Sequence, residues 1–195
     1  MGAIRHAVRV LVSRCFVWEL RWRGVRMEGP VFLFGLPTVG IHPGSSILLG
    51  QKVTLDSSRR ANPLGGVSPC VLRTVAPGAK IRIADSVGIS SSTLVAGNSI
   101  EIGTHTLIGA GCLIIDNDFH APGPGHTWRT EYVKNSKPVR VGAGCFLGAR
   151  SILLKGVQLG DGVVVGAGSV VTKSFPAGSI IAGNPATLVR AQTRP

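Results

Sequence analysis

Residues 141–170 divide without remainder into groups of six, which read VGAGCF, LGARSI, LLKGVQ, LGDGVV and VGAGSV. Every group begins with Val or Leu, and all but the third have glycine in second place. An α-helix repeats every 3.6 residues and a strand every two, so neither explains a strict period of six with glycine after the aliphatic residue. Short strands separated by glycine-containing corners explain both features.

The same period continues upstream, with one extra residue between 98 and 101. The first places of these groups are Val71, Pro77, Ile83, Ile89, Val95, Ile102, Ile108 and Ile114. The fifth places are small or apolar throughout, at Val87, Thr93, Ser99, Thr106, Cys112, Cys145, Ser151, Val157, Val163 and Ser169. We expect both places to point inward, which would make Cys112 and Cys145 small buried side chains.

Three groups of six form one triangular coil of about 18 residues, and successive coils stack about 4.8 Å apart like neighbouring strands. The sequence therefore predicts an all-β parallel solenoid over residues 31–190, followed by a tail at 191–195. Two stretches, about 57–69 and 119–138, do not follow the period and are predicted to leave the solenoid. Long excursions from a regular scaffold are where function concentrates.

Composition limits the class of protein. A chain of 195 residues with 44% apolar residues is long enough for a single core, and a net charge of +12 attracts polyanions. The arginines are scattered and are not interleaved with aromatic residues, so we do not predict nucleic-acid binding. The four cysteines have neither metal-ligand spacing nor the density of a secreted disulfide scaffold, which favours the cytoplasm.

Residues 1–30 do not follow the period of six. Apolar residues recur at helical spacing, at Ile4, Val8, Leu11, Val12, Cys15 and Trp18, while Arg5, Arg9 and Arg14 lie elsewhere around the helix. The arginines interrupt the apolar stretch, so neither a transmembrane anchor nor a signal peptide is expected. A basic amphipathic helix either packs on the solenoid or a neighbouring subunit, or lies on an anionic membrane.

The C-terminal part of the chain resembles a known family. The sequence GDGVVVGAGSVVTK at 160–173, followed by AGNPA at 182–186, is similar to the C-terminal signature of the sugar and xenobiotic O-acetyltransferases. These are hexapeptide-repeat acyltransferases, and the resemblance covers roughly residues 39–190. It implies a left-handed β-helix, an acyl-CoA donor, most simply acetyl-CoA, a sugar hydroxyl as acceptor, and a homotrimer with active sites between subunits.

The candidate catalytic residues lie in IDNDFHAP at 115–122, where the second excursion begins. His120 stands where the resemblance implies a catalytic histidine, and a neutral imidazole can accept the acceptor's proton and return it to the leaving thiolate. Asp116 and Asp118 would share one face of a strand and could orient the ring or bind a substrate hydroxyl. In the alternative interpretation this segment is a polar turn whose carboxylates cap backbone amides.

For the donor, the resemblance implies that backbone amides at two equivalent corners face the pantetheine, at Gly148, Ala149, Gly166 and Ala167. It further places Thr172 and Lys173 near the nucleotide end and Arg190 at a phosphate. The sequence departs from the family at Thr187, where a basic residue is common. The glycines also have a purely structural interpretation, because small corners allow coils to stack.

Other functions remain open. An N-acyltransferase for an amino sugar would use the same donor groove and base, and a non-catalytic scaffold would bind no CoA. His105, His120 and His126 could in principle bind zinc, as in the γ-class carbonic anhydrases that share this type of coil. His126 lies in a loop rich in proline and glycine, and the donor signature would then have no role, so no metal is expected.

Overall fold

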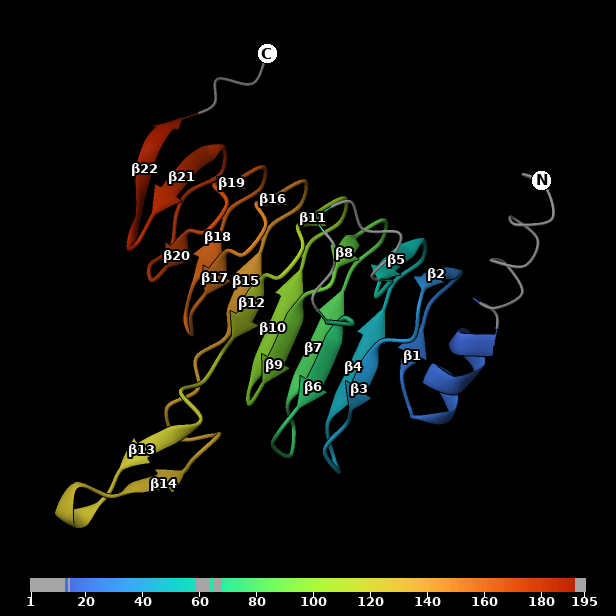
Figure 1. The fold of residues 1–195 in the computed structure, drawn as a ribbon, viewed down its shortest axis with the longest axis horizontal. Helices are drawn as coiled ribbons and strands as arrows, with labels where there is room; N and C mark the ends of the chain where they lie inside the picture. The colour runs from blue at the N-terminus through green and yellow to red at the C-terminus, as the bar shows by residue number, and fades with distance from the viewer. Residues whose placement is uncertain (1–12, 14, 59–63, 65–67, 192–195) are drawn as a thin grey trace.

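The chain forms a left-handed parallel β-helix with three flat sides (Figure 1). The period of six predicts the three-sided coil, and the resemblance to hexapeptide-repeat acyltransferases implies its left hand. The computed structural model describes residues 13, 15–58, 64 and 68–191. Sheet A consists of β1 (Arg26–Met27), β4 (Ser46–Leu49), β7 (Lys80–Ile83), β10 (Ser99–Ile102), β15 (Val139–Val141) and β18 (Gln158–Leu159). Sheet B consists of β2 (Val31–Phe34), β5 (Val53–Asp56), β8 (Gly88–Ser90), β11 (Leu107–Ile108), β16 (Phe146–Leu147), β19 (Val164–Val165), β21 (Ser179–Gly183) and β22 (Ala186–Ala191). Sheet C consists of β3 (Thr38–Gly40), β6 (Val71–Thr74), β9 (Thr93–Ala96), β12 (Leu113–Ile115), β17 (Ile152–Leu153) and β20 (Val170–Val171).

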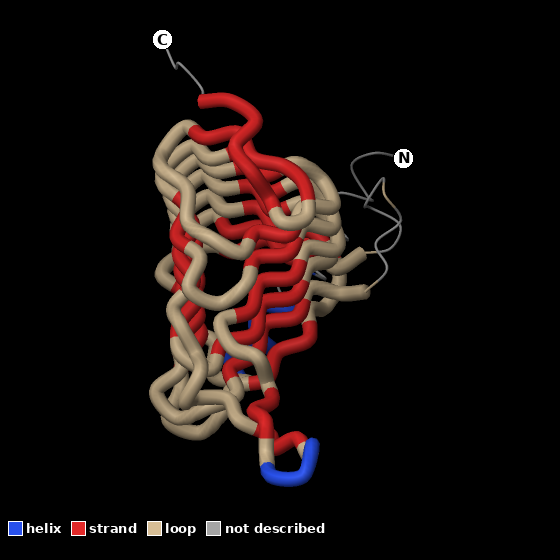
Figure 2. The backbone as a smooth tube through the Cα atoms, turned by 90° about the vertical axis from the view of Figure 1, so that its left-hand side faces the viewer, coloured by secondary structure: helices blue, strands red, loops and turns tan. Residues whose placement is uncertain are grey.

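The chain visits the sheets in the order A, B, C and then returns to A one coil further along. Figure 2 shows the resulting stack of coils. We call the three edges the A–B, B–C and C–A corners. Leu147 pairs with Val165, which is 165 − 147 = 18 residues later, as expected for a coil of three groups of six. Ile83 pairs with Ile102, a separation of 102 − 83 = 19, and Leu94 pairs with Ile114, a separation of 114 − 94 = 20. The coil around Asn98 is therefore longer than 18 residues, and its register changes at more than one corner.

Both inward places of the repeat are buried from Ile102 onward, but the prediction is wrong for several earlier positions. Pro77 is exposed and Val71, Thr93 and Ser99 are half-buried, because the neighbouring residues Leu72, Leu94 and Ile100 are the ones that point inward in β6, β9 and β10.

The aliphatic residues Leu147, Leu153 and Val165 are fully buried, and Cys112 and Cys145 are 2% exposed. Burial raises the pKa of the Cys145 thiol, so at neutral pH this side chain is protonated and acts as a small packing group. The inward-facing prediction is confirmed for these residues.

The second excursion leaves sheet C after β12 and re-enters sheet A at β15. It folds into an antiparallel hairpin of β13 (His120–Pro122) and β14 (Trp128–Thr130), joined through a 3-10 turn at Pro124–His126. The hairpin projects away from the coils (Figure 1). Most of the first excursion lies outside the described residues, apart from its two ends and Leu64.

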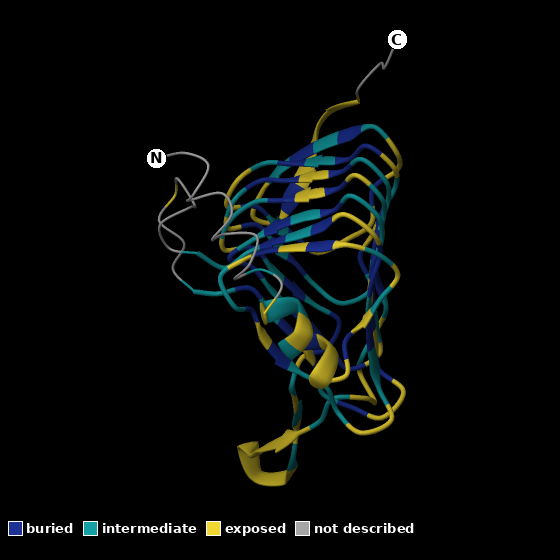
Figure 3. Ribbon diagram, turned by 90° about the vertical axis from the view of Figure 1, so that its right-hand side faces the viewer, coloured by how far each residue is buried: buried dark blue, intermediate teal, exposed yellow. Residues whose placement is uncertain are grey.

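The two ends of the solenoid are covered differently. At the C-terminal end, β22 turns back antiparallel on β21. At the N-terminal end a helix at residues 15–22 lies over the first coil, in front of it in Figure 3. Part of the predicted amphipathic segment, at residues 1–12 and 14, lies outside the described residues, as do residues 192–195 of the predicted tail. No helix within the described part of the chain is long and apolar enough to cross a membrane.

Candidate functional site

The side chain of Asp116 fixes the start of the second excursion to the preceding coil. Its side chain is fully buried, and its carboxylate accepts hydrogen bonds from the backbone amides of Gly97 and Asn98, both at 2.7 Å, and from Asn117 Nδ2 at 2.9 Å. Its carbonyl accepts a bond of 2.8 Å from the amide of Lys137, where the excursion returns. The carboxylate therefore has the contacts of the amide-capping interpretation and is occupied inside the protein.

A short turn then directs the chain outward. The Phe119 amide donates to Asn117 Oδ1 at 3.0 Å, and Phe119 adopts a positive φ of 61°. The Phe119 ring meets the Tyr132 ring edge-on, with centroids 6.2 Å apart, which ties the two arms of the excursion together. The next residue, His120, begins the hairpin and is exposed.

His120 and Asp118 line the same pocket. It has a volume of about 600 Å³ and is completed by Pro122, Trp128 and Asn135. The Asp118 carboxylate forms an ion pair with the ammonium of Lys155, whose side chain is 27% exposed. This pair links the start of the hairpin to the C–A corner of the following coil.

Lys155 was not among the predicted site residues. It stands third in the group LLKGVQ, where the repeat tolerates most residue types. The position of Lys155 in the repeat could have identified it. Residues 154–157 form the C–A corner that stacks next to the corner from which the hairpin leaves, so a long side chain there can reach the hairpin.

The predicted donor residues occupy two stacked B–C corners. Ala149 and Ala167 line a pocket of about 490 Å³ together with Leu64, Ala110, Gly111, Arg150 and Gly168. Arg150 was not predicted to belong to this site, and it places a cationic group beside the two alanines.

The amides at these corners are not equivalent. Gly148 N donates to Val165 O at 2.8 Å, and Gly166 N donates to Ile181 O at 2.8 Å, so both glycine amides belong to the ladder between coils. Within the described residues, the amides of Ala149 and Ala167 donate to no other protein group. The two alanine amides are therefore the ones free to bind a ligand.

The remaining predicted donor residues lie elsewhere on the surface. Thr172 and Lys173 are exposed at the C–A corner after β20, and the Lys173 ammonium lies 5.6 Å from the centroid of the Phe175 ring. Arg190 is exposed on β22, opposite Ile180. Within one chain they are not gathered around the pocket at the B–C corner.

His120 and the alanine corners are likewise separated in a single chain. His120 leaves from the C–A corner, whereas Ala149 and Ala167 lie at the B–C corner, on the other edge of sheet C. The three histidines of the zinc interpretation are also dispersed: His105 lies between β10 and β11, and His126 at the hairpin tip. Among the residues that the structure describes, no three His, Cys, Asp or Glu side chains are placed to hold a metal ion.

Replacing Gly97 by Ala is expected to displace the hairpin. A Cβ at this position would overlap the carbonyl oxygen of Tyr132 and approach Asn117 Nδ2 to 3.3 Å. A shift of about 1 Å in a catalytic group can lower kcat by about 100-fold, and we expect a loss of that size in any activity that depends on His120. Steady-state kinetics beside a thermal melt would separate this local effect from unfolding.

Gly40 provides the matched control for Gly97→Ala. It lies on β3 in sheet C, and its added Cβ would meet only the flexible Arg73 side chain, with Nε at 3.0 Å. Gly40→Ala should therefore leave kcat close to wild type. Equal losses of activity in the two variants would contradict the role of Gly97 in placing the hairpin.

Comparisons with known proteins agree with the fold. Residues 138–173 match the family described as the hexapeptide repeat of succinyl-transferase. The structure resembles AntD, an N-acyltransferase from Bacillus cereus in complex with dTDP and 3-hydroxybutyryl-CoA, with a TM-score of 0.65 and 22% identity over 90% of this chain and 88% of that one.

Two further solved structures share the fold at lower similarity. The polysialic acid O-acetyltransferase OatWY gives a TM-score of 0.51 at 20% identity, over 86% of this chain and 88% of that one. The acetyltransferase domain of PglB from Neisseria gonorrhoeae, in complex with acetyl coenzyme A, gives a TM-score of 0.51 at 16% identity, over 93% of this chain and 67% of that one. The chain thus carries hexapeptide repeats and has the left-handed β-helix fold of hexapeptide-repeat acyltransferases.

Proposed function

We propose that this protein is an acyl-CoA-dependent acyltransferase that transfers an acetyl group from acetyl-CoA to a hydroxyl group of a sugar or glycoconjugate. The observation that carries the proposal is the pair of free amides at Ala149 and Ala167, which line a pocket beside Arg150. Unpaired amides on a glycine-rich corner suit the amide and carbonyl groups of a pantetheine chain, and a guanidinium suits its phosphates.

In the proposed reaction, His120 Nε2 or Nδ1 removes the proton of the acceptor hydroxyl as its oxygen attacks the thioester carbonyl. A tetrahedral oxyanion forms, and backbone amides stabilise it. The carbon–sulfur bond then breaks, the acyl group stays on the acceptor oxygen, and the imidazolium returns the proton to the CoA thiolate. No covalent acyl-enzyme is needed.

The two carboxylates then have separate roles. Asp116 is a positioning residue, because its oxygens hold the excursion on the preceding coil. Asp118 lies in the His120 pocket, where it orients the imidazole or accepts a hydrogen bond from an acceptor hydroxyl, with Lys155 fixing its place. Thr172, Lys173 and Arg190 are assigned to the nucleotide end of CoA, where cations suit phosphates.

A homotrimer joins the two halves of the site. In a ring of three prisms, two sides of each prism pack against neighbours, and the corner between those sides faces the symmetry axis. For the C–A corner with His120 to meet the B–C corner of the next subunit, the packed sides must be sheets A and B. Sheet C then faces outward, and His120 of one subunit serves the amides of another.

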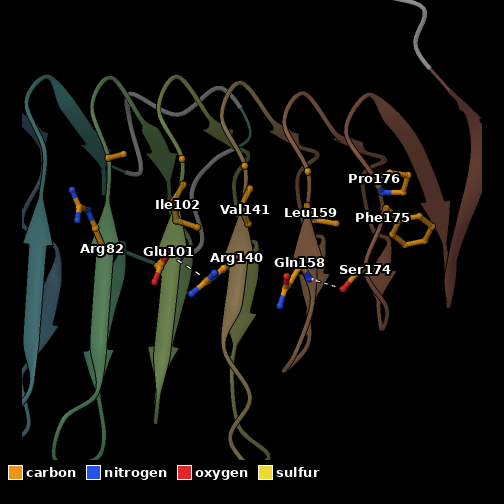
Figure 4. A pocket seen from close by; sticks show the side chains of 14 residues that line it. Arg82, Glu101, Ile102, Arg140, Val141, Gln158, Leu159, Ser174, Phe175 and Pro176 are labelled. Carbon is orange, nitrogen blue, oxygen red and sulfur yellow. Dashed lines mark hydrogen bonds and ion pairs between the residues drawn. The ribbon is translucent and has the colours of Figure 1, made fainter.

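The outward side chains of sheets A and B suit this arrangement. Sheet B presents a column of apolar residues in register, Leu107, Phe146, Val164 and Ile180, of which Leu107 is 52% and Phe146 47% exposed. Across sheet A runs a groove of about 760 Å³, in which Glu101 and Arg140 form an ion pair of 3.6 Å (Figure 4). We propose that the apolar column of one subunit packs into this groove of the next.

Replacing Phe146 by Arg is expected to convert the trimer to monomers, because it would bury a further cation against Arg82 and Arg140 of the groove. Light scattering coupled to size exclusion would measure the change, and acyl transfer should disappear with the trimer. Leu113→Arg is the matched control, since Leu113 is an outward residue of sheet C and should remain in solvent. Phe146→Arg that stays trimeric would rule out sheet B as an interface.

Assays with pooled acceptors test the proposed activity. We expect release of free CoA thiol from acetyl-CoA only when a hydroxyl-bearing sugar is present, together with a product heavier by one acetyl group. An amino sugar that alone acts as acceptor would keep the acyltransferase and replace O-transfer by N-transfer. Absence of both acetyl-CoA binding and thiol release would overturn the proposal in favour of a non-catalytic scaffold.

A further inference from the structure

The helix at residues 15–22 presents two tryptophans to solvent. Trp18 is 71% exposed and Trp22 is 79% exposed, and a separation of four residues puts them on the same face of the helix. Leu20 is fully buried on the opposite face, and Phe16 and Val17 pack against the core beside it. The helix is therefore already anchored without the tryptophans.

This orientation differs from the one predicted from the sequence. The expected apolar face included Cys15 and Trp18, but both are exposed, and the packed face is made by Phe16, Val17 and Leu20. The face that packs on the first coil is the one that carries Leu20. Two large aromatic side chains remain exposed, on a surface that neither the catalytic pocket nor the proposed interface uses.

A cationic group lies on the same face as the tryptophans. Arg21, three residues after Trp18, is exposed and has no ion-pair partner among the described residues, whereas Arg23 pairs with Glu19 at 2.7 Å. The whole chain carries a net charge of +12. Indole rings favour the boundary between lipid headgroups and acyl chains, and arginines are attracted to anionic headgroups.

We propose that Trp18, Trp22 and Arg21 form a docking surface for an anionic lipid bilayer. The helix lies across the N-terminal end of the solenoid (Figure 3), so its exposed face points away from the coils. A ring of three parallel prisms would place all three copies at the same end of the assembly. One flat membrane could then contact the three tryptophan pairs together, and linked contacts bind more tightly than single ones.

Vesicle sedimentation tests this surface. The full chain is incubated with vesicles of equal parts phosphatidylglycerol and phosphatidylcholine, and with vesicles of phosphatidylcholine alone. We expect binding to the mixed vesicles, weakening as salt is raised, and a loss of about tenfold or more in partitioning for the double variant Trp18→Ala, Trp22→Ala. Trp128→Ala is the matched control, because Trp128 is 70% exposed but lies on the hairpin, and should bind like wild type.

A double variant that binds the mixed vesicles as tightly as wild type would overturn the proposal. So would equal wild-type binding to the two kinds of vesicle, or a changed oligomeric state of the double variant, which would make this face a contact between proteins. Thiol release measured without vesicles separates this proposal from the catalytic one. The double variant should keep wild-type turnover there, since the two tryptophans lie outside the proposed site.

Discussion

The variant His120→Ala should lose kcat/KM by about 100-fold to 10,000-fold, the usual contribution of a positioned general base. The expected loss lies in kcat, because His120 removes a proton in the transition state and does not hold the donor. Affinity for acetyl-CoA, measured by calorimetric titration, should stay within about twofold of wild type, since the donor corner at Ala149 and Ala167 is untouched. Its exposed position on the hairpin means that the substitution should not unfold the coils.

His126→Ala is the matched control for this variant. His126 is also an exposed histidine of the same excursion, but it lies at the hairpin tip and does not line the pocket of His120 and Asp118. Its activity should equal that of wild type. If His120→Ala retained full transfer, His120 would not be the base, and a residue of the neighbouring subunit would have to be sought.

Gly148→Ala is expected to cause the largest loss of stability among the substitutions considered. A Cβ at this position would lie 2.5 Å from Ala167 N and 2.7 Å from Val165 O, both backbone atoms of the next coil. Backbone of a stacked coil cannot move aside as a flexible side chain can, so the coils must separate. We expect a cost of about 3 kcal/mol and a melting temperature lower by about 6–12 °C.

Differential scanning calorimetry would measure this change. Gly40→Ala should change the melting temperature by less than about 2 °C, because it requires only a small movement of the Arg73 side chain. Gly148→Ala with a wild-type melting temperature would show that this corner can open. In that case the glycine could not be explained by stacking.

The coil could be predicted from the sequence because every group of six meets the same two packing requirements. An aliphatic residue must fill the interior of the prism, and a small residue must let the corner stack on the next coil. The pairs Leu147-Gly148 and Val165-Gly166 satisfy both requirements. Thirty residues of unbroken repeat made the pattern visible. A change of register near Asn98 could be recognised, but not its size or the inward position of Leu94 in place of Val95.

The details of the site depend on contacts that no period encodes. Asp116 and Asp118 are two residues apart in the same motif, yet the structure buries one carboxylate under backbone amides and pairs the other with Lys155. Arg150 and Lys155 occupy corner places where the repeat allows many residue types. Their proximity to the pockets follows from how coils stack, which is a property of three dimensions.

The N-terminal helix shows the same limit. Its helical period was visible, but two faces were apolar, and only the shape of the first coil decides which one packs. The side with Leu20 is buried, and the side with Trp18 remains in solvent.

The most direct test of a shared active site is acyl transfer by two inactive variants expressed together. His120→Ala lacks the base, and Ala149→Trp fills the donor pocket at the B–C corner. Random assembly should give about a quarter of the sites a wild-type histidine from one subunit and a wild-type corner from its neighbour. We predict that thiol release returns to about a quarter of the wild-type rate, while each variant alone stays inactive. A mixture as inactive as its parents, beside an active wild type, would contradict a site built between subunits.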